Sequence, residues 1–361
     1  MAEQESNALV EAHPMNGGDG PNSYAQNSTV QKRDMEAAKE MISEAISKHL
    51  DIDPNSFSNP SQPFRIADLG CSIGPNTFFA VQNIIEAAES KFKSIKQKSP
   101  QFQVFFNDHV ENDFNTLFRS LPSTRKYFAT GVPGSFYAPL FPNSSLHIIH
   151  LSFALHWLST VPKDHGNSLC WNKESIYCTG KSKEVADAYF GQFKRDMDLF
   201  LNARAEEIVS GGLMCLIMYA LPNRVKFSDT LAGYSFELLG DCLKDMAKRG
   251  VISEEKVESF NIPQYIPTMN EVKEVIKQNQ RFRIVSIGTL ENPSSVLTDQ
   301  MFVGHLRAIV EGVIKNHFGD EMDTDELFSL CLGKLRESCH LFDDEKYLKN
   351  INLCIFLKTQ E

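Results

Sequence analysis

The sequence predicts an α/β protein built on a mostly parallel sheet, with a helical insertion that could cap it. Between residues 65 and 220, short apolar runs alternate with stretches of helical periodicity. The apolar runs are continuous, which is typical of parallel strands covered on both faces. From residue 229 to residue 279 the pattern is mostly helical and interrupts the alternation. These observations together favour one sheet and one helical cap.

The first half of the chain contains four expected strands. A turn rich in Gly, Pro and Asn at residues 17–22 precedes an expected helix over about 30–50. Strands are expected at 65–70, 103–108, 127–132 and 146–153, with a short helix at 113–121. A long helix is expected after the first strand, because apolar residues recur at spacings of three and four on one face: Phe78, Val81, Ile85, Ala88, Phe92 and Ile95.

The second half of the chain completes the sheet. A helix is expected over 183–209, closed by Gly211 and Gly212, and a fifth strand over 213–220. Two late strands fit 282–290 and 352–358, with helices near 302–318 and 324–339 between them. We therefore divide the chain into a disordered N-terminus (1–14), an α/β core (15–228), a helical cap (229–280) and the remaining core strands with further helices (281–361).

Composition limits the class of protein. A chain of 361 residues is long enough for roughly two domains, or for one core with a large insertion. Hydrophobic residues make up 42% and charged residues 23%, so the chain is globular. The net charge of −10 argues against a nucleic-acid partner. Because no run of about 18 apolar residues and no signal-peptide pattern occurs, we expect a soluble cytoplasmic protein with no membrane partner.

The eight cysteines are scattered through the chain and form no C-x-x-C pair. Without a signal peptide, free thiols are the expected state. Cys331, Cys339 and His340 could be imagined as metal ligands, but the leucines around them favour a helix face with buried thiols. The full set is Cys71, Cys170, Cys178, Cys215, Cys242, Cys331, Cys339 and Cys354.

The end of the first strand carries the signal for a cofactor. In an open parallel sheet, ligands bind beyond the carboxyl ends of the strands, at the switch point. There Gly70 lets the backbone approach a ligand and Gly74 permits a tight turn into the helix. The spacing is neither G-x-G-x-x-G nor a P-loop, which lowers the odds of a dinucleotide or a nucleotide phosphate.

Asp108 ends the second strand, where an acid can accept both ribose hydroxyls of a nucleoside. The alternative is that Asp108 only caps the following turn, and taken alone the two interpretations are about even. Together with the glycine turn, a nucleoside site is favoured. An adenosine ligand without a pyrophosphate indicates S-adenosylmethionine rather than NAD.

Motifs along nearly the whole chain resemble those of the plant SABATH methyltransferases, which methylate small carboxylic acids or, in the caffeine branch, xanthine nitrogens. They are MNGG at 15–18, NSYAQNS at 22–28, ADLGCSIGPNT at 67–77, ND at 107–108, NDFN at 112–115, GVPGSFY at 131–137, LHWLS at 155–159 and SFNIPQY at 259–265. The blocks EAHPM (11–15) and FFNDH (105–109) are most similar to the loganic acid methyltransferase branch. The resemblance implies a class I methyltransferase sheet, a role in plant specialised metabolism and a homodimer.

The resemblance also implies how the methyl donor S-adenosylmethionine, which leaves as S-adenosylhomocysteine, is held. His109 stands where a Leu is common in the family, and it would lie near the adenine. The implied donor-binding residues are Tyr24, Gly70, Cys71, Asn76, Asp108, His109, Ser135 and Phe136. Phe136 follows Gly134 and Ser135 in an expected loop, where a large aromatic ring has less reason to belong to the core.

For the methyl acceptor, the resemblance implies that Gln31 and Trp157 donate hydrogen bonds to a substrate carboxylate. Read without the family, Trp157 would most often be core, Gln31 a surface helix residue and His156 a structural histidine. The implied acyl pocket consists of Phe153, His156 and Phe236. A magnesium ion is implied at Asn172, Glu258, Phe260 and Asn261, although methyl transfer does not require it.

The chemistry needs no general base. A carboxylic acid with a pKa near 4 is already ionised at neutral pH. The task is therefore to align oxygen, methyl carbon and sulfur in a water-poor pocket. Phe236 stands where relatives carry His or Trp, and Phe153 replaces a frequent Tyr. With Met218, Tyr219, Leu221 and Phe227 nearby in sequence, this predicts an apolar pocket for a hydrophobic terpenoid or aromatic acid.

Two other functions stay open at this point. A xanthine-type N-methyltransferase would keep the donor site but exchange the carboxylate-orienting residues, and the retention of Gln31 beside Trp157 argues against it. A non-catalytic protein that binds S-adenosylmethionine or a small acid is disfavoured by the complete donor motif.

Overall fold

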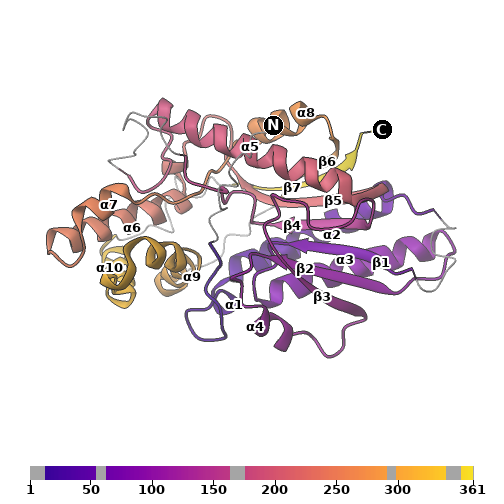
Figure 1. The fold of residues 1–361 in the computed structure, drawn as a ribbon, viewed down its shortest axis with the longest axis horizontal. Helices are drawn as coiled ribbons and strands as arrows, with labels where there is room; N and C mark the ends of the chain where they lie inside the picture. Colours follow the sequence, from indigo (N-terminus) through magenta and orange to yellow (C-terminus); the bar gives the residue numbers. More distant parts are fainter. Residues whose placement is uncertain (1–12, 54–61, 163–174, 291–297, 339–350, 361) are drawn as a thin grey trace, which may run out of the picture.

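The computed structural model describes residues 13–53, 62–162, 175–290, 298–338 and 351–360, and its centre is one seven-stranded sheet (Figure 1). The strand order is β3-β2-β1-β4-β5-β7-β6. The first five strands are parallel, and β7 is antiparallel to both β5 and β6. The strands are β1 (Phe64–Leu69), β2 (Phe102–Asp108), β3 (Tyr127–Pro133), β4 (Leu146–Ser152), β5 (Ile208–Ala220), β6 (Phe282–Leu290) and β7 (Ile351–Thr359).

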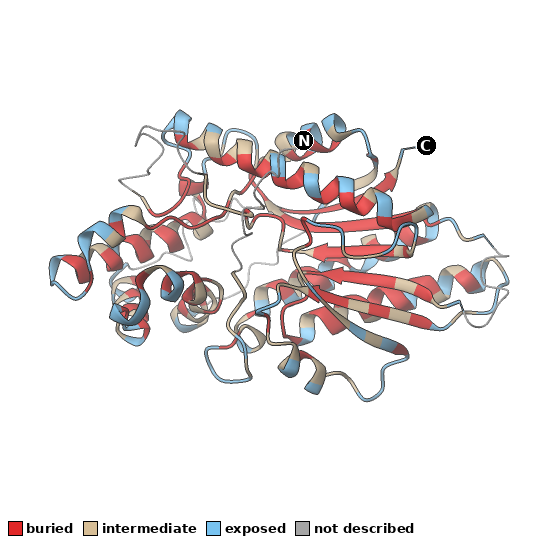
Figure 2. Ribbon diagram, in the orientation of Figure 1, coloured by how far each residue is buried: buried red, intermediate tan, exposed pale blue. Residues whose placement is uncertain are grey.

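Helices cover both faces of the sheet, which explains the continuous apolar strands. Side chains alternate between faces, so Ile66 of β1 packs with the helices on one side and its neighbour Ala67 packs with those on the other. One face carries α2 (Thr29–His49) and α3 (Pro75–Ser94), and the other carries α5 (Lys183–Glu207) and α8 (Met269–Asn279). Figure 2 shows the buried residues concentrated in the strands and on the inner faces of these helices.

A helical cap lies beyond the end of the sheet, to the left in Figure 1. Its helices share one hydrophobic cluster, and Trp157 and Tyr219, which follow or end strands of the sheet, pack against that cluster. The cap helices are α6 (Leu231–Lys248), α7 (Glu254–Ser259), α9 (Asp299–Phe318) and α10 (Thr324–Glu337), and the remaining short elements are α1 (Tyr24–Asn27), α4 (Phe114–Arg119), η2 (Phe227–Asp229) and η3 (Gly319–Glu321).

The predicted α/β sheet with a helical cap is confirmed, and each predicted strand exists within a few residues of its expected bounds. The helix α8 belongs to residues 229–280 but packs on α5 and β6 at the sheet. Conversely, α9 and α10 follow residue 280 in sequence but pack with α6 in the cap. The division into 15–228, 229–280 and 281–361 stays a prediction. Of the predicted disordered segment 1–14, residues 1–12 lie outside the described part of the chain.

The prediction that Gly211 and Gly212 close the helix over 183–209 is wrong. The helix ends at Glu207 and the chain continues directly into β5. Gly211 and Gly212 lie inside that strand, where Gly211 has φ +80° and the pairing with β4 shifts between Leu146 and Ile148. A side chain at Gly212 would meet the carbonyl oxygen of His147, so the glycine pair forms a bulge instead of closing a helix.

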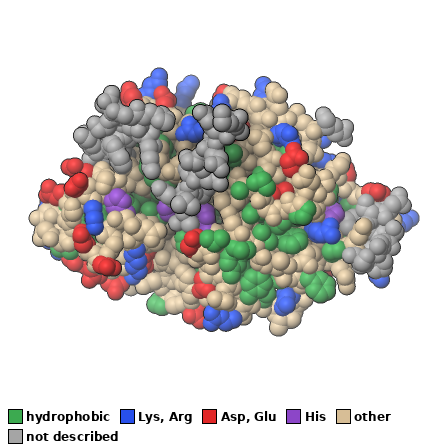
Figure 3. Space-filling model, in the orientation of Figure 1, with side chains coloured by type: hydrophobic (Ala, Val, Ile, Leu, Met, Phe, Trp, Pro, Cys, Tyr) green, Lys and Arg blue, Asp and Glu red, His purple; other side chains and the backbone are tan. Residues whose placement is uncertain are grey.

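Three further features concern the cysteines, the helices and the edge of the sheet. Six cysteines in the described residues are free thiols, and Cys170 and Cys339 lie outside them, as does His340. No helix among the described residues is both long and apolar enough to cross a bilayer. The edge strand β3 leaves Phe128 59% exposed, and Figure 3 shows hydrophobic side chains gathered over the region of β2 and β3.

Candidate functional site

The loops after β1 and β4 meet at the switch point of the sheet. Gly70 has φ +72°, and a Cβ on it would lie 2.8 Å from the Cβ of Ala154. Glycine is therefore required for both the backbone conformation and the space. The backbone N–H groups of Gly70 and Cys71 both donate to the carbonyl of Asn107, at 2.9 and 3.0 Å. This ties the glycine turn to the end of the neighbouring strand β2.

Asp108 lies at the carboxyl end of β2 with its side chain held by backbone groups. One carboxylate oxygen accepts from the N–H of Ser72 at 2.7 Å, and the other from the N–H of His109 at 2.8 Å. Burial raises the pKa of Asp108, and these hydrogen bonds oppose the rise. Each oxygen keeps a further lone pair, so the carboxylate can still accept two hydroxyl groups. The turn-capping alternative and the ligand role are thus compatible in geometry.

The loop after β3 carries Ser135 and Phe136 to the same place. The amide of Asn107 donates to the carbonyls of Val132 and Gly134, at 2.8 and 2.9 Å, which docks this loop onto β2. The expectation that Phe136 stands outside the core is wrong, since its side chain is buried and packs edge-on against Phe200. A Cβ atom added at Gly70 would lie 3.7 Å from Cε1 of the Phe136 ring.

The N-terminal segment closes over the glycine turn. Asn76, at the start of α3, donates to the backbone and side-chain oxygens of Ser28, at 3.1 and 2.9 Å. This contact brings Tyr24 next to Asp108, and burial together with that carboxylate raises the pKa of the Tyr24 hydroxyl. All eight predicted donor-binding residues therefore lie on segments that converge at the carboxyl ends of β1, β2 and β3.

A second group of predicted residues gathers around Tyr219 at the end of β5. The side-chain nitrogen of Gln31 lies 3.4 Å from the hydroxyl oxygen of Tyr219. The ring centroids of Phe153 and His156 lie 4.6 and 5.4 Å from that of Tyr219. Gln31 is buried rather than at the surface, so its interpretation as an ordinary surface residue is wrong. Phe153 adopts φ +52°, which turns the loop after β4 toward this group.

Trp157 extends this second group. It is half-buried, and its ring centroid lies 6.1 Å from that of His156 and 6.1 Å from that of His13. Its carbonyl accepts from the hydroxyl of Tyr137 at 2.6 Å, which connects it to the loop after β3. The two groups thus meet through Tyr137 and through the N-terminal segment.

The histidines in this group are uncharged at neutral pH. Burial lowers the pKa of His156 to about 3, and burial together with the charge of His109 lowers the pKa of His13 to about 4. Nδ1 of His156 is buried and has no hydrogen-bond partner among the described residues. A buried ring nitrogen without a partner is costly unless a ligand satisfies it.

Phe236 lies apart from these rings. It is buried in the cap cluster, with ring centroids 5.6 Å from Tyr177 and 5.8 Å from Phe227. Among the described residues, no ring contact joins it to Phe153 or His156. Its link to the second group is indirect, because Tyr219 and Trp157 pack against the same cluster.

The predicted metal ligands offer Mg²⁺ little. Asn172 lies outside the described residues and Glu258 is exposed on α7. The side-chain oxygen of Asn261 lies 3.4 Å from the Tyr189 hydroxyl, which donates to it, and the Phe260 ring is buried. The part of the chain that the structure describes contains no group of three or more His, Cys, Asp or Glu able to hold a metal. The ligand set stays a prediction, and no step below passes through a metal.

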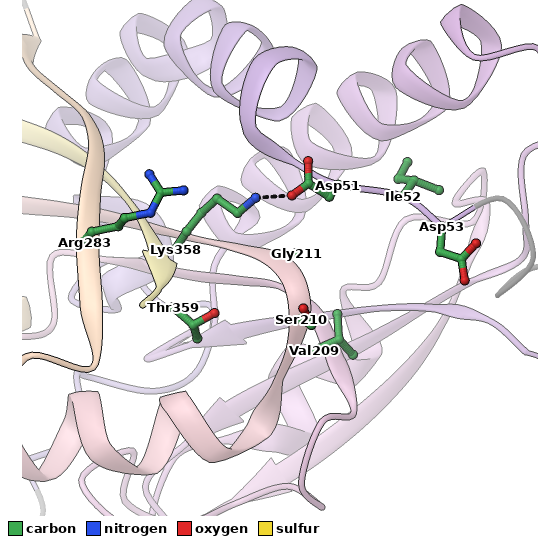
Figure 4. Close-up of a pocket in the computed structure, with 9 residues that line it drawn as sticks. All are labelled: Asp51, Ile52, Asp53, Val209, Ser210, Gly211, Arg283, Lys358 and Thr359. Atoms are coloured by element: carbon green, nitrogen blue, oxygen red, sulfur yellow. Dashed lines mark hydrogen bonds and ion pairs between the residues drawn. The ribbon is translucent and has the colours of Figure 1, made fainter. Parts of the chain in front are cut away.

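A separate cavity of about 770 Å³ lies at the opposite ends of the strands from the candidate site (Figure 4). This cavity is formed at the amino end of β5. The candidate site, in contrast, lies beyond the carboxyl ends of the parallel strands. Lys358 of β7 pairs there with Asp51, next to Arg283 of β6. The remaining lining residues are Ile52, Asp53, Val209, Ser210, Gly211 and Thr359. None of them was predicted to bind a ligand.

Two residues near the second group escaped the sequence analysis. His13 precedes the first helix, and His305 lies on α9, where its Nε2 is 3.4 Å from the Gln31 nitrogen. His13 stands in the EAHPM block but was given no role there, and His305 stands in none of the quoted motifs, because each reaches the group only through contacts between distant segments. Tyr219 was expected in the pocket, but not as its centre.

Comparison with known proteins places this geometry in a family. The model of the family described as "SAM dependent carboxyl methyltransferase" matches residues 10–360. The chain is 51% identical to loganic acid O-methyltransferase of Catharanthus roseus, over 97% of this chain and 95% of that one. It is 43% identical to farnesoic acid carboxyl-O-methyltransferase of Arabidopsis thaliana, over 90% and 92%. The solved structure "Loganic acid methyltransferase with SAH" superposes with a TM-score of 0.91 at 49% identity, covering 96% of this chain and 99% of that one.

Proposed function

The chain belongs to the S-adenosylmethionine-dependent carboxyl methyltransferases, an enzyme family with the class I methyltransferase fold, and on this basis we propose how it makes a methyl ester. The donor occupies the loops after β1, β2 and β3, with its ribose hydroxyls on Asp108. The acceptor acid lies against the group around Tyr219, with its carboxylate between Gln31 and Trp157. The observation that carries this proposal is that the two groups meet at the carboxyl end of the sheet.

The reaction is a displacement at the methyl carbon of a sulfonium ion. A carboxylate oxygen forms the new bond to the methyl carbon while the carbon–sulfur bond breaks and sulfur keeps the electron pair. The products are the neutral ester and S-adenosylhomocysteine, and no proton moves. The protein's contribution is therefore alignment at about 3 Å in a site that excludes water, which can lower the barrier by roughly 7–11 kcal/mol.

Neutral donors suit this reaction. Gln31 and Trp157 each carry an N–H that can hold a carboxylate in place. A cation would stabilise the carboxylate before reaction, and its pull would weaken the attacking oxygen. The lowered pKa values of His13 and His156 support this picture, because both rings are uncharged at neutral pH. Nδ1 of His156 can then accept a hydrogen bond from a hydroxyl group of the acid.

For the substrate we propose a largely hydrophobic terpenoid or aromatic acid. The lining is aromatic and apolar, with Phe153 against Tyr219, and Tyr219 in turn packs against the apolar cap cluster that contains Phe236. Similar relatives are named for loganic acid and farnesoic acid. The apolar side chain at position 153, and the apolar cap cluster around Phe236 behind Tyr219, favour an acid without a sugar.

We expect three further properties, of which only the homodimer rests on the family resemblance alone. We expect a homodimer, which size-exclusion chromatography with light scattering measures directly. We expect a cytoplasmic location in the cell. We expect activity that survives chelation of magnesium, because the displacement needs no Lewis acid. We also propose that residues 15–228 hold the donor and that 229–280 cover the acid.

The test is transfer of labelled methyl from S-adenosylmethionine to a panel of carboxylic acids and xanthines. Neutral, base-labile products from hydrophobic acids are expected. Label found only on xanthines, in base-stable form, would replace the carboxylate assignment with N-methylation. Donor binding without transfer to any acceptor would favour a binding protein.

The carboxylate role has its own prediction. Gln31→Ala and Trp157→Ala should each lower kcat/KM for the acid by tenfold or more, because each removes a hydrogen bond to a charged group. The Kd for S-adenosylmethionine should change less than twofold. Gln278→Ala, an exposed glutamine on α8, is the matched control. Equal losses of acid turnover and donor affinity would show that these residues act elsewhere.

A further inference from the structure

His305 contacts Gln31 from α9, the cap helix that faces the N-terminal segment. Its Nδ1 lies 3.0 Å from the backbone oxygen of Asn27. Because a carbonyl oxygen only accepts hydrogen bonds, Nδ1 must carry the proton. Burial lowers the pKa of His305, so the ring is neutral and Nε2 is an acceptor. The backbone therefore decides which tautomer Gln31 meets.

This tautomer decides the orientation of the Gln31 amide. Nε2 of His305 lies 3.4 Å from the amide nitrogen of Gln31. An acceptor needs a donor opposite it, so the nitrogen end of the amide faces His305 and the oxygen end faces away. The amide oxygen is buried and has no donor partner among the described residues, so no hydrogen bond on that side fixes the amide. Without His305, both orientations of the amide would be open.

The second N–H of the amide faces Tyr219. In the substrate-free protein the hydroxyl oxygen of Tyr219 lies 3.4 Å from the amide nitrogen, a long hydrogen bond. A carboxylate is a stronger acceptor than a phenol and would replace it. If the amide were flipped, its oxygen would face the carboxylate and repel it. One hydrogen bond to His305 thus determines whether Gln31 attracts or repels the acid.

We propose that His305 is a positioning residue for the methyl transfer: it acts through Gln31, by holding the amide so that an N–H is directed at the substrate carboxylate. This inference rests on the proposed function of Gln31. His305 itself needs no contact with the acid. Its effect should therefore disappear when Gln31 is absent.

The test is a double-mutant cycle between the two residues. His305→Leu should lower kcat/KM for the best acid about tenfold and leave the Kd for S-adenosylmethionine within twofold. In the Gln31→Ala background the same substitution should cause no further loss. His305→Gln should keep most of the activity that His305→Leu loses, because its amide oxygen can accept from Gln31 and its N–H can donate to the backbone oxygen of Asn27. His305→Met replaces the Leu variant if the latter does not fold.

The outcomes separate the two claims. If Gln31→Ala leaves acid turnover unchanged, the proposed role of Gln31 fails and this inference fails with it. If Gln31→Ala is impaired but His305→Leu behaves as the wild type, only the inference fails. Equal losses from His305→Leu in both backgrounds, or no recovery in His305→Gln, would mean that His305 contributes only to packing.

Discussion

At the scale of single residues, two acids at adjacent strand ends have different hydrogen-bond partners. Asp68 of β1 is engaged by side chains, with Nδ1 of His150 at 2.6 Å and the hydroxyl of Thr77 on its other oxygen. Asp108 is held by backbone N–H groups alone and keeps lone pairs for a ligand. Both acids stand in motifs that carry the family resemblance, and only their partners in the fold leave Asp108, rather than Asp68, available for the proposed ribose contact.

Asp108→Asn should weaken S-adenosylmethionine binding by about 10- to 150-fold, the equivalent of a charged hydrogen bond worth about 1.5–3 kcal/mol. Titration calorimetry measures the change. Asp113→Asn is the control, because Asp113 caps α4 by accepting from the backbone N–H of Thr116. An unchanged Kd in Asp108→Asn would exclude its contact with the ribose.

At the scale of elements, the glycine turn between β1 and α3 depends on a neighbouring loop. Gly70 and Gly18 have nearly equal dihedrals, φ +72° and +75°, but only Gly70 faces another atom, Ala154, at close range. Sequence patterns cannot separate two such glycines, because the difference lies in what packs against them. It follows that the two should respond differently to the same substitution.

Gly18→Ala should cost about 1 kcal/mol of unfolding free energy, from the strain of a positive φ. Gly70→Ala should cost clearly more unfolding free energy, because the turn must move away from Ala154. The same movement should also weaken the binding of the methyl donor. Urea denaturation and calorimetry measure the two effects. Equal stabilities of the two variants would show that the β1 and β4 loops do not press on each other.

Another element-scale contact holds the loop after β3. Arg204 of α5 is fully buried, pairs with Glu207 at 2.7 Å and donates to the carbonyls of Phe136 and Ala138, at 2.5 and 2.9 Å. Glu207 in turn accepts from the backbone of Leu140. Removing one member of such a pair leaves a buried charge without its partner. This pair is how a distant helix positions the loop that carries Ser135 and Phe136.

At the scale of the whole molecule, packing of α2 against the sheet buries an acid. Asp34 is 1% exposed, and burial raises its pKa to about 7 from an ordinary value of 3.8. Between these two values the folded protein holds a proton that the unfolded chain has released. Its contribution to stability therefore falls as the pH rises from about 4 to about 7, by up to about 1.4 kcal/mol per pH unit.

Asp34→Asn removes this ionisation while keeping the shape of the side chain. The variant should match the wild type most closely near pH 4 and become progressively more stable than it up to pH 7. Urea denaturation across this range measures the difference. Glu40→Gln, an exposed acid on the same helix, should show no such trend. A constant difference between Asp34→Asn and wild type would contradict a raised pKa.

The sequence by itself determined the sheet and its helices, because these depend on strand and helix periodicity. It also predicted a donor site from motifs at the strand ends. Tertiary structure decided the rest. The Gly211–Gly212 bulge depends on the pairing of β5 with β4, and the burial of Gln31 and Phe136 depends on the sheet they pack against. The contact of His305 with Gln31 joins residues 274 positions apart. A contact at that separation leaves no period or spacing in a single sequence, since only the folded chain brings its partners together.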